Sequence, residues 1–299
     1  KIKQILVIIL EESQYLSLLN DIFLNGIDRD DRTGIGTRSI FGGKLDFDLT
    51  DKFPLLTTKK MWLKGIFHEL MWILSGSTDN KELQKNKVKI WNGNSSREFL
   101  DSRNLNHYEE GDIGPTYGFA IRSYGTKYEG CAKKYIGSGF DQLEYVIDLI
   151  KNEPTSRRIL INLWDPTVID EVALTPCLMT YNFYVDTVNK KLNLQGYIRS
   201  SDTLLGLPWN ISYLSLLVYL ICNIKGIDLT PGKLNIITCD QHIYKNHFDQ
   251  VAEQLKREPY PFPKLNINRK VNNISDFTWD DLELIDYKYH ESIKAKMAV

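Results

Sequence analysis

Cys177 is a candidate nucleophile because of the residue types that accompany it. It follows Pro176, and Arg199 and Asn210 come later in the same part of the chain. A thiolate attacks electron-poor carbon, arginine binds phosphate with a fork of donors, and an amide offers a base-like ring both a donor and an acceptor. Together the three residues are candidates for a site that binds an anion and a base-like ring next to a nucleophile. The alternative for Cys177 is a buried structural thiol, since free cysteines are among the most buried residues.

Four other candidate residues also have both a functional and a structural interpretation. Glu69 is embedded among apolar residues, and a carboxylate is costly to bury without a purpose, so it indicates either a site or a salt bridge. Arg157 and Arg158 precede a predicted strand and fit either an anion site or a solvated edge. Asn210 fits a base-reading amide or a helix cap, and the two roles are compatible.

Composition indicates a globular protein whose anion sites are local. The chain has 299 residues, of which 42% are hydrophobic and 25% charged, and its net charge is −1. This length suits one large domain or two small ones, and the balanced charge gives no general attraction to nucleic acid or membrane. The apolar segment 5–10 is too short to span a bilayer and has no cleavage site of a signal peptide.

The four cysteines are scattered, without a Cys-x-x-Cys pair. A disulfide framework or a zinc site is therefore not expected, and reduced thiols predict the cytoplasm, or alternatively the nucleus. Because the chain begins at Lys1, we expect it to be trimmed or taken from a longer polypeptide.

Hydrophobic periodicity predicts an α+β domain, because helices and strands follow one another without regular βαβ alternation. Helices are expected at 12–24, 61–74, 140–151, 211–224 and 247–257, and strands at 39–48, 158–164, 179–186, 192–198 and 234–238. Segment 211–224 is apolar almost throughout and predicts a buried central helix. Strands 179–186 and 192–198 predict a hairpin, and loops are expected at 32–37 and across 92–139.

Eleven motifs in order, from Tyr15 to Val299, resemble those of the thymidylate synthase family. They are Asp31-Arg32-Thr33-Gly34, Phe53-Pro54-Leu55-Leu56-Thr57-Thr58-Lys59-Lys60, His68-Glu69-Leu70, Ile90-Trp91, Gly114-Pro115-Thr116-Tyr117-Gly118, Ser156-Arg157-Arg158-Ile159, Pro176-Cys177, Arg199-Ser200-Ser201-Asp202, Asn210-Ile211, Asp240-Gln241-His242-Ile243-Tyr244 and Met297-Ala298-Val299. The insert at 97–118 is similar to that of eukaryotic and protozoal members.

The resemblance implies one three-layer α+β domain over residues 1–299, with 1–14 as a linker or amino-terminal extension. Its central sheet would be mixed or mostly antiparallel, and two copies would pack through it as a homodimer. The implied reaction is reductive methylation of dUMP to dTMP, with 5,10-methylenetetrahydrofolate as donor of carbon and hydride and no metal. A dihydrofolate reductase fused ahead of Lys1 is compatible with this family.

The resemblance also implies a role for each site residue. Cys177 would add to carbon-6 of uracil, and Arg157 and Arg158 would reach the phosphate of the partner subunit's substrate. The implied catalytic residues are Cys177, Glu69, Tyr117, Arg199 and Asn210. The implied dUMP-binding residues are Arg32, Arg157, Arg158, Arg199, Ser200, Ser201, Asp202, Asn210, His242 and Tyr244. The implied folate-binding residues are Lys59, Trp91, Asp202, Leu205, Gly206, Trp209 and Ala298.

Several positions depart from the usual family pattern. Leu178 stands where histidine is usual, Ile198 where glutamine is usual, and Trp209 where phenylalanine is usual. Segments 120–123 and 239–242 also differ. Two alternatives therefore stay open: a hydroxymethylase acting on dUMP or dCMP, and a weakly active or inactive regulator that binds nucleotide or its own messenger RNA. Apart from that messenger, nucleic acid is not an expected partner.

Overall fold

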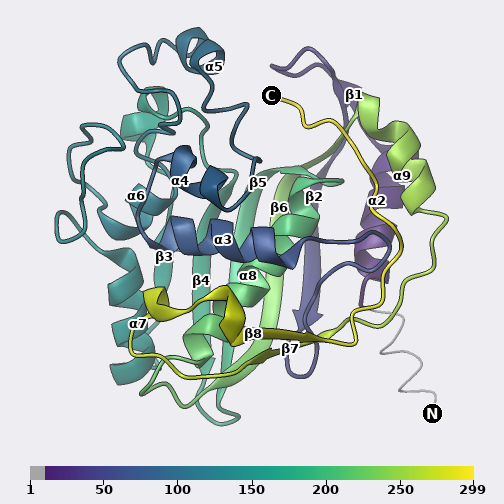
Figure 1. Cartoon of the computed structure of the whole chain (residues 1–299). Coiled ribbons are helices and arrows are strands. Elements are labelled where there is room, and N and C mark those ends of the chain that lie inside the picture. The colour runs from purple at the N-terminus through teal and green to yellow at the C-terminus, as the bar shows by residue number, and fades with distance from the viewer. Residues whose placement is uncertain (1–10) are drawn as a thin grey trace, which may run out of the picture.

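The computed structural model describes residues 11–299, and its centre is a six-stranded sheet (Figure 1). The apolar segment 5–10, and most of the expected extension 1–14, lie outside the described residues. The strand order is β1-β2-β6-β5-β4-β3. Only β5 and β6 run parallel, and every other neighbouring pair is antiparallel. The predicted mixed α+β fold is confirmed.

The strands of the large sheet are β1 (Ile27–Arg29), β2 (Thr37–Asp48), β3 (Leu160–Asn162), β4 (Leu178–Asp186), β5 (Lys191–Asp202) and β6 (Thr230–Tyr244). A second sheet pairs β7 (Lys264–Ile267) with β8 (Leu282–Ile285). The α-helices are α2 (Ser13–Asn25), α3 (Leu63–Leu74), α4 (Asn80–Lys85), α5 (Arg97–Ser102), α6 (Gly118–Arg122), α7 (Gln142–Asn152), α8 (Gly206–Cys222) and α9 (Phe248–Gln254). Short 3₁₀ turns are η1 (Pro166–Glu171), η2 (Lys245–His247), η3 (Ile274–Asp276) and η4 (Trp279–Asp281).

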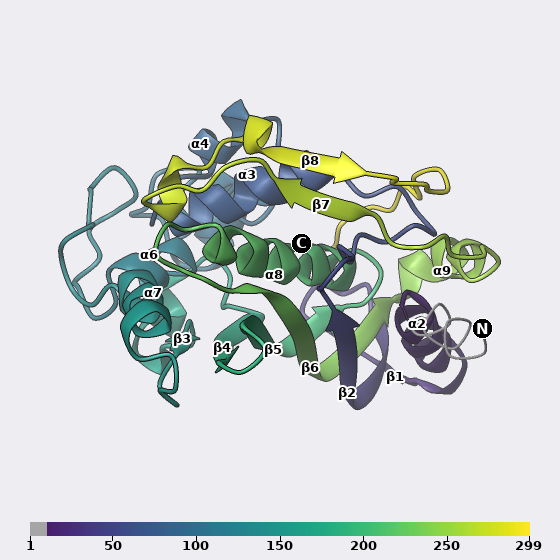
Figure 2. The ribbon, with the colours of Figure 1, turned by 90° about the horizontal axis from the view of Figure 1, so that it is seen from below.

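Helix α8 lies between the large sheet and an outer layer formed by α3 and the β7–β8 pair (Figure 2). Most of its residues are buried, as its continuous apolar sequence predicts. Gly196 of β5 permits the close approach, because a Cβ at that position would come within 2.6 Å of Leu214 Cδ1. The sheet, α8 and the outer layer are the three layers, and the predicted site residues are distributed over strands, loops and the helices α3 and α8.

The opposite face of the sheet is open in the described chain. No helix lies beneath the central strands β4, β5 and β6 in Figure 2, and Phe41 and Tyr184 are 89% and 68% exposed. Large exposed aromatic side chains on one sheet face are typical of an interaction surface. The predicted packing of two copies through the sheet remains a proposal.

The strand expected at 234–238 is much longer in the structure, because β6 extends over Thr230–Tyr244. Its ends carry Pro231, Asp240 and His242, which interrupt the apolar pattern, but pairing with β2 and β5 continues through them. Tertiary pairing thus overrides the local propensity of these residues. Strands β1, β7 and β8 were not expected, since they are only three or four residues long.

Candidate active site

Cys177 lies immediately before β4, beside Arg199 of β5. The Arg199 amide donates to the Cys177 carbonyl at 2.9 Å. The backbone hydrogen bonds that join β4 and β5 therefore set the distance between Cys177 and Arg199. The Cys177 amide donates to the Tyr117 hydroxyl at 3.1 Å. Tyr117, Cys177 and Arg199 therefore meet at the backbone of Cys177.

Hydrogen bonds hold the guanidinium of Arg199 against the segment that carries the Cys177 thiol. Its Nε donates to the Pro176 carbonyl at 2.9 Å, and one terminal nitrogen donates to Oγ1 and the carbonyl of Thr175 at 2.7 and 3.1 Å. The same nitrogen lies 4.0 Å from Cys177 Sγ, and the group sits 5.3 Å from the centroid of the Trp164 ring. Thr175 and Trp164 are site residues that the sequence did not reveal, because nothing local marks their contact with Arg199.

Two opposing effects act on the thiol. Burial raises the pKa of Cys177 above its ordinary value, whereas the charges of Arg199 and Arg32 lower it and that of Asp202 raises it. The net shift is upward. The thiolate of this protein therefore depends on nearby cations, and Arg199 is the first of them.

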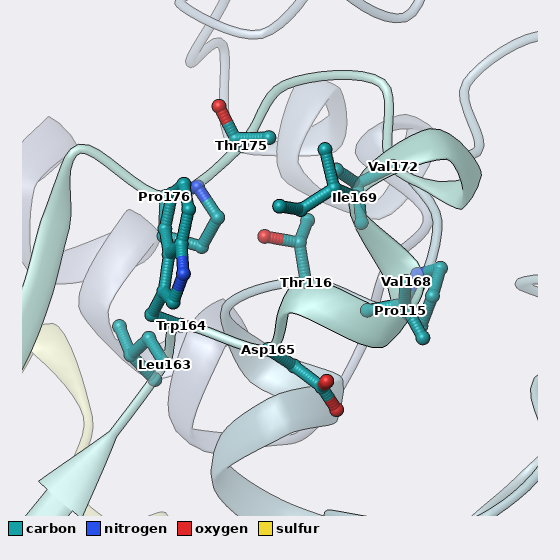
Figure 3. A pocket seen from close by; sticks show the side chains of 10 residues that line it. All are labelled: Pro115, Thr116, Leu163, Trp164, Asp165, Val168, Ile169, Val172, Thr175 and Pro176. Atoms are coloured by element: carbon teal, nitrogen blue, oxygen red, sulfur yellow. The ribbon is translucent and has the colours of Figure 1, made fainter.

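A small pocket lies next to this segment (Figure 3). Thr175, Pro176 and the Trp164 ring form one side of it, and Thr116 contributes a buried hydroxyl that has no hydrogen-bond partner among residues 11–299. The remaining lining residues are Pro115, Leu163, Asp165, Val168, Ile169 and Val172. The pocket borders the residues that hold Arg199, so packing here supports the position of the guanidinium.

Glu69 of α3 is held by two tryptophans. Trp91 Nε1 donates to one carboxylate oxygen at 2.8 Å, and Trp209 Nε1 donates to the other at 2.5 Å. The residue is only 7% exposed, and burial raises the pKa of Glu69 while both indole bonds oppose the rise. The Trp91 ring packs edge-on against Tyr117, with centroids 5.4 Å apart. Glu69 therefore belongs to the same cluster as Cys177, which favours the site over the salt-bridge alternative.

Tyr117 connects this cluster to the thiol and has an unusual backbone. Its φ is +35°, a conformation that side chains rarely adopt, and it precedes the short helix α6. Burial, followed by the charge of Cys177, raises the pKa of Tyr117 well above its usual range. The hydroxyl thus stays protonated at neutral pH and can donate a hydrogen bond.

Asp202 shapes the turn from β5 into α8. Its Oδ1 accepts from the amides of Leu204 and Leu205 at 3.0 and 3.1 Å. Gly206 is the first residue of α8, and a Cβ there would meet nothing closer than the Asp202 side chain at 3.6 Å. This turn places Leu205, Gly206 and Trp209 on one side of the cluster.

Lys59 faces inward at this turn. It is buried, and its Nζ donates to the Leu204 carbonyl. Burial lowers the pKa of Lys59 to about 8, while Asp202 and Glu12 act in the opposite direction. An ammonium in this position holds the turn, so the structure gives no support to the prediction that it attracts a folate tail.

Asn210 lies inside α8 rather than at its start. The cap position is Leu205, and the helix begins at Gly206, so the helix-cap interpretation of Asn210 is wrong. The reason is that Gly206, Leu207 and Pro208 form the first turn, where proline is tolerated. Asn210 is half-buried, and within residues 11–299 its amide has no hydrogen-bond partner, so both its donor and its acceptor are free.

His242 and Tyr244 of β6 lie next to each other, with ring centroids 5.2 Å apart. His242 Nδ1 is 3.0 Å from Asp240 Oδ1, which fixes the imidazole. Burial and the charge of Asp202 raise the pKa of Tyr244 to about 12, and Arg32 and Cys177 also act on it. Arg32 itself packs 5.7 Å from the centroid of the Phe99 ring.

The two serines of β5 differ in exposure. Ser200 is half-buried, whereas Ser201 is buried and its hydroxyl has no partner in the described chain. Leu178 and Ile198 face each other across β4 and β5 and are both buried. Where the family usually has two polar side chains, this site therefore has an apolar pair.

Arg157 and Arg158 are not brought to Cys177 within this chain. Both are exposed at the start of β3, the edge strand of the sheet. Neither side chain forms an ion pair or a hydrogen bond among the described residues. They are therefore free to meet an anion that the chain itself does not supply.

The carboxyl terminus lies at the top of the view in Figure 1, between α5 and β1. A Cβ on Gly93 would come within 2.7 Å of a Val299 methyl group, so the last residue packs on the turn that carries Trp91. His247 Nε2 is 2.7 Å from the Lys296 carbonyl, which holds the preceding segment. Ala298 is half-buried between these two contacts.

Comparison with known proteins identifies the family. The family model described as thymidylate synthase matches residues 13–299. The chain is 47% identical over 288 residues to human thymidylate synthase, an alignment that covers 96% of this chain and 91% of the relative. The chain belongs to the thymidylate synthase family. The predicted family and its classification as a methyltransferase are confirmed.

Other members of the thymidylate synthase family show a similar relationship. The thymidylate synthase of Human herpesvirus 8 type P (isolate GK18) is 48% identical over 289 residues, covering 97% of this chain and 85% of the relative. A bifunctional dihydrofolate reductase-thymidylate synthase of Zea mays is 46% identical over 289 residues, and the alignment covers 55% of that relative. These relatives do not favour a hydroxymethylase or a non-catalytic regulator.

Two further features of the described residues concern metal binding and membrane spanning. Among residues 11–299, no group of three or more histidine, cysteine or carboxylate residues is arranged to hold a metal ion. In the same part of the chain, no helix has the length and apolar character needed to cross a bilayer.

Proposed function

We propose that this chain catalyses the reductive methylation of dUMP to dTMP, with 5,10-methylenetetrahydrofolate as the donor of carbon and hydride. The observation that carries the proposal is the placement of Arg199 4.0 Å from Cys177 Sγ in a chain of this family. Carbon-5 of uracil is a poor nucleophile until a group adds at carbon-6. Addition of the Cys177 thiolate at carbon-6 produces an enolate that can attack the folate methylene carbon.

Arg199 has two tasks in this proposal. Its charge favours the thiolate, and its remaining donors can bind the phosphate of dUMP. Arg32 and Ser200 would bind the same phosphate, and Ser201 and Asp202 would line the nucleotide on β5. His242 and Tyr244 would hold the ribose hydroxyl, which their adjacent polar atoms can contact.

Asn210 would recognise the uracil ring. Its free amide offers a donor and an acceptor, which match the oxygen-4 and N3–H of uracil. Cytosine carries an amino group and no N3–H, so it would require the amide turned by 180°, with its donor and acceptor exchanged. The absence of a partner for Asn210 in the described chain supports this role.

Glu69 and Tyr117 would handle protons. Glu69 lies in a buried cluster with Tyr117, whose hydroxyl contacts the backbone of the nucleophile at 3.1 Å. Glu69 can accept the carbon-5 proton through a water molecule, and Tyr117 can act as donor because its hydroxyl stays protonated.

The folate would lie between Trp91 and Trp209, against Leu205 and Gly206, with Asp202 at the pterin. Val299 packs on the Trp91 turn, and Ala298 and Val299 would exclude water before hydride transfer. We assign Lys59 to the support of the Leu204 turn, so any effect of Lys59 on the folate tail acts through that turn.

A homodimer completes the phosphate site in this proposal. Among residues 11–299, exposed Arg157 and Arg158 find no anion, and the open sheet face carries the exposed Tyr184, which suits contact with a second copy. A fused dihydrofolate reductase is supported by relatives of that name. Four free cysteines support the cytoplasm or the nucleus.

The test is product analysis. The protein is incubated with dUMP and 5,10-methylenetetrahydrofolate, and the nucleotide is identified by mass spectrometry while dihydrofolate is followed by absorbance. We expect dTMP and dihydrofolate in equal amounts. A 5-hydroxymethyl nucleotide without dihydrofolate, or no product at saturating substrate, would overturn the proposal.

A further inference from the structure

Trp209 does more in this structure than line the predicted folate site. Its indole N–H points at Glu69 and donates to the carboxylate oxygen that Trp91 leaves free, at 2.5 Å. The contact bridges α8 and α3, the two helices that carry these residues. We propose that Trp209 is a positioning residue for the reaction, which fixes the orientation of Glu69 and supplies the second of its two indole donors.

The two indoles are the donors on which this carboxylate depends. A buried carboxylate is costly unless it is hydrogen-bonded, and bonds to a charged group are stronger than neutral ones. Within residues 11–299, Trp91 and Trp209 are the hydrogen-bond donors to Glu69. With one donor on each oxygen, the carboxylate cannot rotate without losing both bonds, and its remaining lone pairs keep a fixed direction.

No cation compensates for the charge of Glu69 among the described residues. The titratable groups that face it are Tyr117 before α6, Tyr181 of β4 and Tyr213 of α8. Burial raises the pKa of each of these hydroxyls, so all three are neutral at physiological pH. Burial also raises the pKa of Glu69, and only the two indole bonds oppose that rise. Loss of the Trp209 donor therefore favours the protonated form of Glu69.

Trp209→Phe separates this role from packing, because it keeps an aromatic ring and removes the N–H. The inference rests on the proposed function for its kinetic consequence. The acid limb of the kcat profile is expected to lie about one to two pH units higher in the variant than in the wild type. Packing alone would raise KM for the folate at every pH and leave the profile in place.

Trp72→Phe is the matched control. Trp72 is buried and its Nε1 also donates a hydrogen bond, but to the backbone carbonyl of Asp79 at 3.0 Å rather than to Glu69. The control loses the same chemical group, so we expect a loss of thermal stability without a displaced pH profile. An equal displacement in both variants, or none in Trp209→Phe, would overturn the proposal.

A second measurement needs no catalysis. In ¹⁵N-labelled protein, loss of one indole resonance in Trp209→Phe assigns the Trp209 N–H. We expect that resonance to shift with pH in the wild type and to stop shifting in Glu69→Gln. A pH-independent Trp209 resonance in the wild type would overturn the proposal. If Trp209→Phe fails to fold, all indole resonances are followed instead, and fewer than two that shift with pH in the wild type and stop shifting in Glu69→Gln would overturn it. If the resonance titrates but the protein makes no dTMP, the contact stands and the proposed function is wrong.

Discussion

Removal of the Arg199 charge tests how the nucleophile is activated. The terminal nitrogen of Arg199 lies 4.0 Å from Cys177 Sγ. At about 4 Å, two unit charges interact by about 1 kcal/mol in the dielectric of water and by about 4 kcal/mol at the effective dielectric near a protein surface. Arg199→Gln should therefore lower the thiolate population at a fixed pH by about fivefold to about a thousandfold.

The expected loss of reactivity is smaller than the loss of thiolate. A thiolate of higher pKa is intrinsically more nucleophilic, and this offsets about half of the effect on a logarithmic scale. Alkylation of Cys177 by iodoacetamide at pH 7 should thus slow by about two- to thirtyfold in Arg199→Gln. Mass spectrometry of the digested protein separates Cys177 from Cys131, Cys222 and Cys239.

Thr175→Val provides the control for this experiment. It removes the hydroxyl that accepts from Arg199 at 2.7 Å but keeps the charge and the carbonyl contacts. Its alkylation rate should stay closer to that of the wild type than the rate of Arg199→Gln. If Arg199→Gln is folded by circular dichroism and alkylates at the wild-type rate, the charge of Arg199 does not activate the thiol.

Three further predictions concern other parts of the site. Burial holds the pKa of Lys59 at about 8 in the folded protein against 10.5, so the unfolded state binds more protons between these values. Relative to Lys59→Met, the wild type should gain up to about 3 kcal/mol of unfolding free energy as pH rises from about 8 to 10.5, and parallel urea midpoints for the two proteins would contradict this. Asn210→Asp should reduce the preference in kcat/KM for dUMP over dCMP by at least about tenfold, whereas unchanged discrimination would remove Asn210 from base recognition. Mixing Arg158→Ala with Cys177→Ala should restore activity that neither variant has alone, because one hybrid site is then intact; no recovery after subunit exchange would exclude a shared site.

Much of the fold could be predicted because its elements carry strong local patterns. The apolar run that became α8 and the hairpin of β4 and β5 are examples, since burial on one or both sides dictates their sequence. The ends of β6 were missed because polar residues interrupt its apolar pattern there. Pairing with β2 and β5 nevertheless holds these residues in the strand. The short strands β1, β7 and β8 carry too few residues to form a pattern.

The sequence marked the candidate site residues by type but did not reveal their contacts, because contacts depend on packing. Motifs identified Cys177, Arg199 and Glu69, because their chemistry fixes the residue type. They did not reveal Trp164 or Thr175, because only the folded structure shows that these two residues contact Arg199. Nor could they show that Trp209 bonds Glu69 or that Lys59 faces inward, since side-chain direction depends on the packing of α3, α8 and the Leu204 turn.

Covalent capture of the nucleophile tests the central claim most directly. The protein is incubated with 5-fluoro-dUMP and 5,10-methylenetetrahydrofolate, denatured, and weighed by intact mass spectrometry. The account predicts an adduct that contains both ligands, maps to Cys177 and is absent from Cys177→Ala. No adduct at saturating ligands, or an adduct that persists in Cys177→Ala, would contradict it.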